Sequence, residues 1–283
     1  MDILALILTT LTALLSPVGL VVDSLAEQAI RHQTAAIEAI QVRVDNAPNH
    51  QILMGCIDHL QISAQGLRLR QLPDLRVEAI DLEADPLDVD VARLRQGQLQ
   101  LDQPAQAALR LRLRADDLNA FLASQQVREW LDSLQVSLPG PGLARQRQRY
   151  GLANPNLEFL PSDRLRIVVD LQDRVTQESI PVLLELGLAV VEGTRLELVD
   201  PKIKIDGAEA PPQLITALAA GASEEFTLKR LEEFGLTARI LALTLADQQL
   251  DLAIFARLEP SSPFLVRPVA TPNPLSPMST QAF

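Results

Sequence analysis

The stretch AALRLRLRADDLN, residues 107–119, alternates leucine with arginine over three successive pairs. Alternation with period two is typical of a β-strand that has one solvent-facing side and one apolar side. Similar alternation recurs through most of the chain, and the apolar side of each such strand must lie against something. The sequence therefore predicts long, one-sided strands. What covers their leucine side is the main functional question.

The alternating segments fall into two groups, with helical spacing between them. Pro86 and Pro104 interrupt the first group, and because proline lacks the amide needed in a central ladder, both suggest bends, bulges or edges. The segments ADDLNAFL and SQQVREWLDSL have helical spacing, and Asp116 is placed to cap the first turn. The predicted strand segments are 41–47, 52–70, 75–94, 97–114, 164–173, 179–207 and 236–260, with hairpin turns at 192–194 and 246–249.

This order of elements predicts an α+β fold. Long antiparallel strands need a cover for their apolar side, so we expect a long, curved antiparallel sheet wrapped around amphipathic helices. Residues 20–40 have helical spacing suited to that position, since Leu25, Ala29 and Ile37 recur on one side. The loop LPGPG, residues 138–142, separates the two groups of strands.

Two of the predicted strands carry opposite charges on their polar sides. The first has Asp81, Glu83, Asp85, Asp88 and Asp90, and the second has Arg110, Arg112 and Arg114. If the strands pair antiparallel, cross-strand ion pairs between these groups would set the register, at about 0.2–1 kcal/mol each. A divalent metal site is the other interpretation of the carboxylates, but strand alternation alone explains their spacing. We therefore interpret them as a solvated face.

Aromatic residues make up only 3% of the chain, although 47% of it is hydrophobic. Leu, Val, Ile and Ala must therefore supply the buried volume, at roughly 1.5–3 kcal/mol for each fully buried leucine. Such a core has smooth aliphatic walls. The formal net charge of −11 argues against nucleic acid as a partner, because phosphate binding requires clustered Lys and Arg.

The chain begins with an uncharged apolar run from Ile3 to Val22. About twenty helical residues at 1.5 Å each span roughly 30 Å, the thickness of the hydrocarbon core of a bilayer. We expect an uncleaved anchor or partly inserted helix; the alternatives are an atypical export signal and an apolar helix docked on the protein's own core. The predicted organisation is a membrane-associated segment at 1–22, an α+β domain at 23–259 and a Pro-rich disordered tail at 260–283.

Known catalytic motifs are missing from the sequence. His32, His50 and His59 have no paired-ligand spacing, and neither a G-x-S-x-G elbow nor a phosphate-binding glycine loop occurs. Cys56 is the single cysteine, which excludes an intrachain disulfide and a cysteine-rich metal site. We therefore predict a protein without enzymatic activity, metal or cofactor. The basic segment ARQRQRYG, residues 144–151, is either an exposed loop or a contact for anionic headgroups.

Two long segments resemble a known family. VDNAPNHQILMGCIDHLQISAQGL (44–67) and IDLEADPLDVDVARLRQGQLQLDQPAQAALRLRLRADDLNAFL (80–122) contain an AP…IL.G entry, a D.DV..L..G turn region and an LRL.L…DLN..L strand-to-helix junction. These elements are similar to the bacterial LmeA-like phospholipid-binding family. The early segment LLSPVGLVVD is similar to that of cyanobacterial members.

The resemblance implies a lipid-binding role in a fold similar to the tubular lipid-binding proteins related to bactericidal permeability-increasing protein. There, a curved sheet wraps a long helix and leaves an apolar groove. The implied partners are a phospholipid or glycolipid and a membrane of the cell envelope, on the periplasmic side or at the thylakoid. The candidate acyl-chain lining residues are Leu109, Leu111, Leu113, Ile80 and Leu82; the alternative is that the leucines simply fill the core. The alternative function is a membrane-anchored scaffold that binds a protein partner.

Overall fold

The computed structural model describes residues 34–46, 51, 54–70, 72–94, 100–133, 150–213, 215–216, 227–246, 248–263 and 265. The predicted membrane segment, the arginines of the basic segment and most of the predicted tail lie outside the described residues. Within the described part, no helix combines the length and the hydropathy that a membrane crossing requires.

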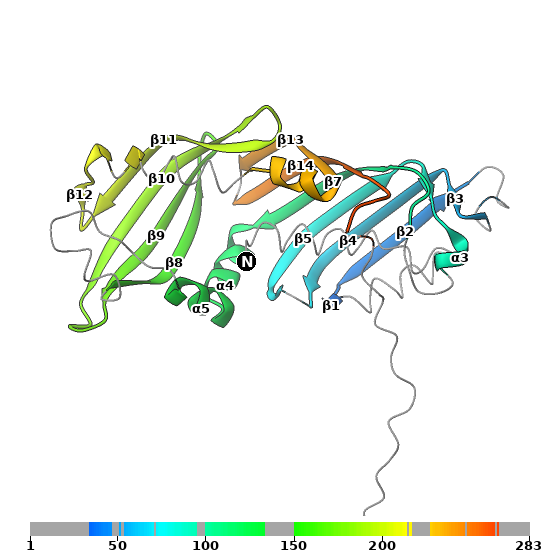
Figure 1. Ribbon diagram of the computed structural model, residues 1–283. Helices are drawn as coiled ribbons and strands as arrows, with labels where there is room; N and C mark the ends of the chain where they lie inside the picture. Colours follow the sequence, from blue (N-terminus) through cyan, green and yellow to red (C-terminus); the bar gives the residue numbers. More distant parts are fainter. Residues whose placement is uncertain are drawn as a thin grey trace, which may run out of the picture.

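Two antiparallel sheets lie side by side along an elongated molecule (Figure 1). The larger sheet has seven strands in the order β1-β4-β5-β7-β14-β13, and β2 pairs with the same strand, β4, as β1 does. Its strands are β1 (Thr34–Ala36), β2 (Ala39–Asp45), β4 (His59–Leu69), β5 (Leu72–Ala84), β7 (Ala105–Arg114), β13 (Leu236–Ala246) and β14 (Gln249–Leu258).

The smaller sheet has five strands in the order β12-β11-β10-β9-β8. Its strands are β8 (Tyr150–Leu160), β9 (Arg164–Asp173), β10 (Ser179–Val191), β11 (Arg195–Ile205) and β12 (Ala208–Glu209). A short separate ladder joins β3 (Cys56–Ile57) to β6 (Leu87–Asp88). The fold is therefore dominated by long antiparallel strands, as the alternation predicts, although they form two main sheets and not one.

Few described residues are helical. The helices include α3 (Val91–Leu94), α4 (Ala115–Leu122), α5 (Gln125–Ser133) and the 3₁₀ helix η3 (Lys229–Phe234). Helices α4 and α5 lie near the junction of the two sheets, where Val127 and Leu131 of α5 pack against Leu72 and Leu75 of β5 (Figure 1). The single tryptophan, Trp130, lies on the outer side of α5 and is 42% exposed.

The strand-to-helix junction matches its sequence prediction closely. The strand ends at Arg114 and α4 spans ADDLNAFL, where the period of the apolar residues changes from two to helical spacing. The expected cap is wrong, because Arg114 occupies the N-cap position and no side-chain cap bond forms there. Asp116 lies in the first turn, where its charge favours the helix dipole.

The predicted helix over residues 20–40 is wrong from Thr34 onward. Thr34–Ala36 and Ala39–Asp45 are strands that both pair with β4. In the second of them Ile40, Val42 and Val44 alternate with polar residues, and pairing with an available strand prevails over the local helical spacing. The part of this prediction before Thr34 lies outside the described residues.

The hairpin of β13 and β14 belongs to the larger sheet, although the strands that precede it in the chain, β8 to β12, form the smaller sheet. Strand β14 pairs with β7, so residues 249–258 lie beside residues 105–114.

Packed structure continues past the predicted domain end at 259. Ser262 is fully buried and Leu265 belongs to the core around β13 and β14.

One glycine of the family-like entry motif has a clear structural role. Gly55 has φ +94°, and a β-carbon built there would lie 2.0 Å from the carbonyl oxygen of Val89. Any larger residue would collide with this backbone group, so the close approach of the two segments requires glycine. Asn46, directly before this motif, accepts from the amide of Asp58 and donates to the carbonyl of Cys56, both at 2.8 Å.

Candidate lipid-binding face

Four of the five predicted lining residues lie in two adjacent rows that cross the larger sheet. Leu82 is opposite Leu109, and Ile80 is opposite Leu111. Because side chains alternate along each strand, both pairs project from the same face. The first row is Val42, Ile62, Leu82, Leu109, Ile254 and Ile240, and the second is Ile40, Ala64, Ile80, Leu111, Leu252 and Leu243. Neither row contains a charged residue.

These four side chains are only 3–7% exposed, whereas Leu113 is half-buried. The described members of their buried cluster all come from the larger sheet, the β3–β6 ladder or the connection at Ile37. One face of a sheet cannot bury itself, because it needs a second layer about 10 Å away. For the part of this face on β4, β5 and β7, the described parts of α4, α5 and the smaller sheet therefore do not supply the covering layer. At β13 and β14, Ile240 and Ile254 belong to a cluster that also contains Leu231 of η3, with Val190 and Leu196 of the smaller sheet packed against it.

The smaller sheet has an aliphatic face too. Its central row is Leu157, Ile167, Leu184 and Ile203, and a second row is Val169, Val182 and Ile205. Of these residues only Ile203 is buried, and the others are half-buried. This face was not predicted as a lining surface. Strand β9 carries consecutive Ile167, Val168 and Val169, so alternation in the sequence does not mark one side.

The aliphatic faces of the two sheets meet at a shared core. Leu245 of β13 and Ala115 of α4 are buried with Phe159, Leu165 and Leu186 of the smaller sheet. Leu250 packs against this group and is the cross-strand partner of Leu113. The predicted lining residue Leu113 therefore lies where the two faces join. Together they make one continuous apolar surface, in which Phe159 lies at the join among Leu, Ile, Val and Ala side chains.

Asn119 holds α4 against the edge strand of the smaller sheet. Its side-chain amide donates to the carbonyl of Leu157 at 2.8 Å and accepts from the amide of the same residue at 2.7 Å. Strand β8 is the edge of its sheet, so its outer backbone groups have no neighbouring strand to bond. The Asn119 side chain satisfies two of them, the amide and the carbonyl of Leu157. Asn119 is the asparagine of the DLN motif at the strand-to-helix junction.

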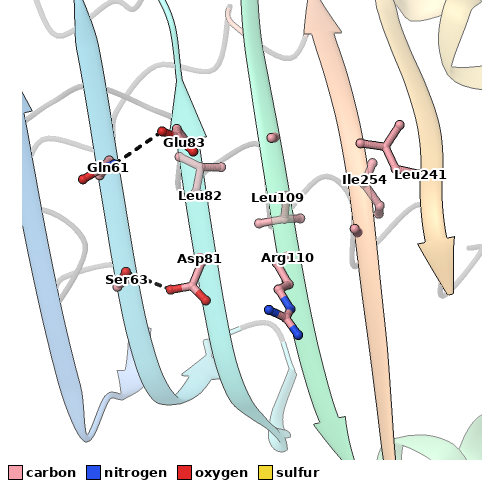
Figure 2. Close-up of a pocket in the computed structure, with 11 residues that line it drawn as sticks. Gln61, Ser63, Asp81, Leu82, Glu83, Leu109, Arg110, Leu241 and Ile254 are labelled. Atoms are coloured by element: carbon pink, nitrogen blue, oxygen red, sulfur yellow. Dashed lines mark hydrogen bonds between the residues drawn. The ribbon is translucent and has the colours of Figure 1, made fainter. Parts of the chain in front are cut away.

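The opposite, polar face of the larger sheet contains a hollow of about 310 Å³ (Figure 2). Carboxylates line it on the β5 side, where Asp81 accepts from Ser63 at 2.8 Å and Glu83 accepts from Gln61 at 3.3 Å. Arg110 of β7 and Leu241 of β13 line its other sides. The strand positions of Leu82 and Leu109 contribute to its floor, although alternation directs their side chains to the other face.

The predicted antiparallel pairing of the charged strands is confirmed, but the predicted ion pairs are wrong. Asp81 is the direct cross-strand partner of Arg110, yet Arg110 and Arg112 both bond the same oxygen of Asp251 at 3.3 Å. Arg114 approaches Asp116 instead. Strand β14 pairs with the other edge of β7 and supplies the competing carboxylate of Asp251. Because β14 is distant from β7 in the sequence, this pairing was not predicted.

His59 lies between two carboxylates at one end of this polar face. Its Nδ1 bonds Asp85 and its Nε2 lies 3.1 Å from Glu83. The hydrogen bond to Asp85 is the main cause that raises the pKa of His59 above the ordinary value, with further contributions from the charges of Asp85, Glu83 and Asp45. Histidine at this position is therefore a charged structural residue below neutral pH.

Arg76 gathers three carboxylates at the boundary between the larger sheet and α4. It bonds Glu38 at 2.9 and 3.0 Å, Glu78 at 2.5 Å and Asp117 of α4 at 3.0 Å. The hydrogen bond from Arg76 lowers the pKa of Glu38. In turn, the hydrogen bonds to Glu38, Glu78 and Asp117, with the charge of Asp117, raise the pKa of Arg76. The guanidinium thus ties three separate chain segments together.

Comparison with known proteins agrees with the aliphatic surface. The model of the LmeA-like phospholipid-binding family matches residues 14–255, most of the chain. The chain belongs to this family. Membership of the LmeA-like family supports lipid binding, and the family is not a known family of enzymes. No curated protein and no solved structure matches the chain.

Among the residues that the structure describes, no group of three or more His, Cys, Asp or Glu side chains is arranged to hold a metal ion. The thiol of Cys56 donates to Asp88 at 3.4 Å, and burial is the first cause that raises its pKa. A thiol with a raised pKa is a poor nucleophile.

Proposed function

We propose that this protein holds the acyl chains of a phospholipid against the continuous aliphatic surface of its two sheets. The observation that carries the proposal is the union of the two uncharged faces at Leu113, Leu245 and Leu250. Acyl chains gain about 0.8 kcal/mol for each methylene removed from water, and they require no directed bonds. A surface without charged or aromatic side chains in its central rows suits such a ligand.

Within this surface we assign different tasks to different residues. Ile80, Leu82, Leu109 and Leu111 form the buried floor of the larger sheet, and Leu113 lies at its open margin toward the smaller sheet. The half-buried row of Leu157, Ile167 and Leu184 provides the area on which a ligand gains most burial. We further propose that the protein works at a membrane of the cell envelope, carries lipid between sites there, and has the tubular architecture of lipid-transfer proteins.

Native mass spectrometry of the full chain after exposure to liposomes tests the proposal. A folded sample should retain phospholipid in a fixed ratio, identified by extraction. Leu184→Asp should reduce the retained lipid at least about tenfold, because a carboxylate on this face must be desolvated by the acyl chain. A folded wild-type sample that shows only the apo mass would overturn lipid binding and favour a protein-binding scaffold.

The neighbouring residue supplies a matched control. Leu183 is also half-buried, but it lies on the opposite face, where its cross-strand partners are Val168 and Lys204. Leu183→Asp should leave lipid retention close to that of the wild type, with circular dichroism used to verify folding of both variants. Equal loss of lipid in the two variants would show that the proposed face is wrong.

A further inference from the structure

The hollow on the polar face of the larger sheet is separate from the proposed acyl-chain surface, because side chains that alternate along a strand project from opposite faces of the sheet. It arises where small side chains replace long ones. Ala108 and Ala253 line it together with longer side chains of β5, β7 and β13. Its volume of about 310 Å³ is at the lower end for small-molecule sites. A headgroup-sized ligand fits this volume, whereas a whole diacyl lipid does not.

The charges around the hollow are divided between its two sides. On the β5 side Asp81 has only the hydroxyl of Ser63 as a bonded partner among the described residues, and Asp81 forms no ion pair there. On the β7 side Arg110 and Arg112 share one oxygen of Asp251. One carboxylate facing two guanidinium groups leaves that side with an excess of positive charge.

Asp81 and Arg110 are direct cross-strand partners, but their charged groups do not pair. Asp251 draws the Arg110 guanidinium toward β14, and 59% of the Arg110 side chain remains exposed. A planar guanidinium has five N–H donors, so the bonds to Asp251 leave donors available for an anion. The hollow thus presents an anionic acceptor on β5 and a cationic donor on the adjacent strand β7, with Ala108 on the same strand as the donor and Ala253 opposite it on β14.

Leu241 adds an apolar side to this arrangement. It lies at an irregularity in the pairing of β13 with β14 and is 64% exposed. With Ala108 and Ala253 it gives the carbon skeleton of a ligand something to lie against. No such apolar contact would benefit a simple inorganic ion.

We propose that this hollow binds an ammonium–phosphate zwitterion of the phosphoethanolamine type. Its ammonium group bonds the carboxylates of Asp81 and Glu83, its phosphate accepts from Arg110, and the linking carbons lie beside Ala108. Carbons esterified on the other side of the phosphate extend over Ala253 toward Leu241. Charge-assisted bonds from arginine to phosphate provide orientation as well as attraction. The same chemistry occurs in a lipid headgroup at a membrane surface and in a free soluble zwitterion.

Ligand-observed saturation-transfer NMR on the full chain, with glycerophosphoethanolamine as the probe, tests the site. Asp81→Asn and Arg110→Gln should each weaken binding at least about fivefold, because each removes one of the two opposite charges. Glu259→Gln and Arg257→Gln are the controls. These two residues form an exposed ion pair at the end of β14 and do not line the hollow, so binding should not change.

Two further comparisons decide what kind of ligand is bound. Inorganic phosphate and ethanolamine should each bind more weakly than the zwitterion; equal binding of either would overturn the two-charge site, as would the absence of saturable binding by the probe. Vesicles of phosphatidylcholine with and without phosphatidylethanolamine separate the sources. Stronger binding that depends on phosphatidylethanolamine and is lost in Asp81→Asn supports a membrane headgroup. Binding of the soluble probe alone supports a free zwitterion.

Discussion

The two sheets bury their aliphatic faces to different extents. In the larger sheet, the row from Val42 to Ile240 has no side chain that is more than 9% exposed. In the smaller sheet, Leu157, Ile167 and Leu184 of the corresponding central row are all half-buried. Both rows have the same kind of residue, so composition does not cause the difference. It lies in how completely each face is covered.

This difference separates two uses of the same apolar side chains. A fully buried row contributes its transfer free energy to folding and has little area left to remove from water. A half-buried row contributes less to folding and retains area that a ligand can cover. The larger sheet is therefore suited to stability, and the smaller sheet to the binding of a ligand that gains from burial.

Alanine substitutions in the two rows provide the strongest test of this division. Leu109→Ala should lower the free energy of unfolding by about 3 kcal/mol, since a buried leucine leaves a cavity behind. Leu184→Ala should cost only about 1 kcal/mol, because its side chain is already partly in water. Urea denaturation of both variants measures the difference. Equal losses would contradict the contrast between the sheets.

Arg76 and Arg166 offer a second comparison of the two sheets. Arg76 bonds three carboxylates with 20% of its side chain exposed, whereas Arg166 of β9 bonds Glu158 and Glu185 with 34% exposed. Arg76→Gln should cost about 2 kcal/mol, because it leaves three carboxylates close together without a cation. Arg166→Gln should cost clearly less in the same denaturation assay, and the reverse order would refute this ranking.

Asn119 tests how the two sheets are joined. Asn119→Ala removes both bonds to Leu157 and should cost about 1–2 kcal/mol. Asn119→Asp keeps an acceptor but loses the donor, so it should have an intermediate effect at a pH where the carboxylate is charged. Hydrogen exchange at the Leu157 amide should become faster in Asn119→Ala. Unchanged exchange there would show that α4 is held against β8 by apolar packing alone.

The smallest effect is expected from His59, which belongs to the larger sheet only. Its pKa is raised in the folded protein, so its contribution to stability is fully present below the pKa of the unfolded chain and is lost as pH rises through the folded value. His59→Gln should therefore be less stable than the wild type at about pH 5.5 and equal to it at about pH 9. A difference between the two proteins that stays constant over this range would exclude the charged histidine as its cause.

Local patterns in the sequence predicted local structure well. The change from period two to helical spacing located the boundary between β7 and α4 at Arg114 and Ala115. The turn at 192–194 joins β10 to β11 as predicted. Thr34–Ala36 shows the limit of such patterns, because these residues become a strand only through pairing with β4. That partner lies too far along the chain for local periodicity to reveal.

Local alternation also predicted the part of the candidate surface that lies on the larger sheet. Ile80, Leu82, Leu109, Leu111 and Leu113 alternate with charged residues, and the structure places all five on one face. The apolar face of the smaller sheet was not predicted. In strands such as β9, consecutive residues are apolar, so the sequence does not show which side chains face the core. Only the register of β8, β9, β10 and β11 shows which of those side chains lie together.

The place of Trp130 on α5 has a practical consequence for spectroscopy. It is the only tryptophan in the chain, so the intrinsic emission at long wavelength reports the surroundings of one helix. That helix packs against Leu72 and Leu75 and lies apart from the central rows of both sheets. A lipid held on those rows should leave the emission maximum unchanged. A blue shift on mixing with vesicles would instead report that α5 itself enters the interfacial region of the bilayer, where indole rings are favoured.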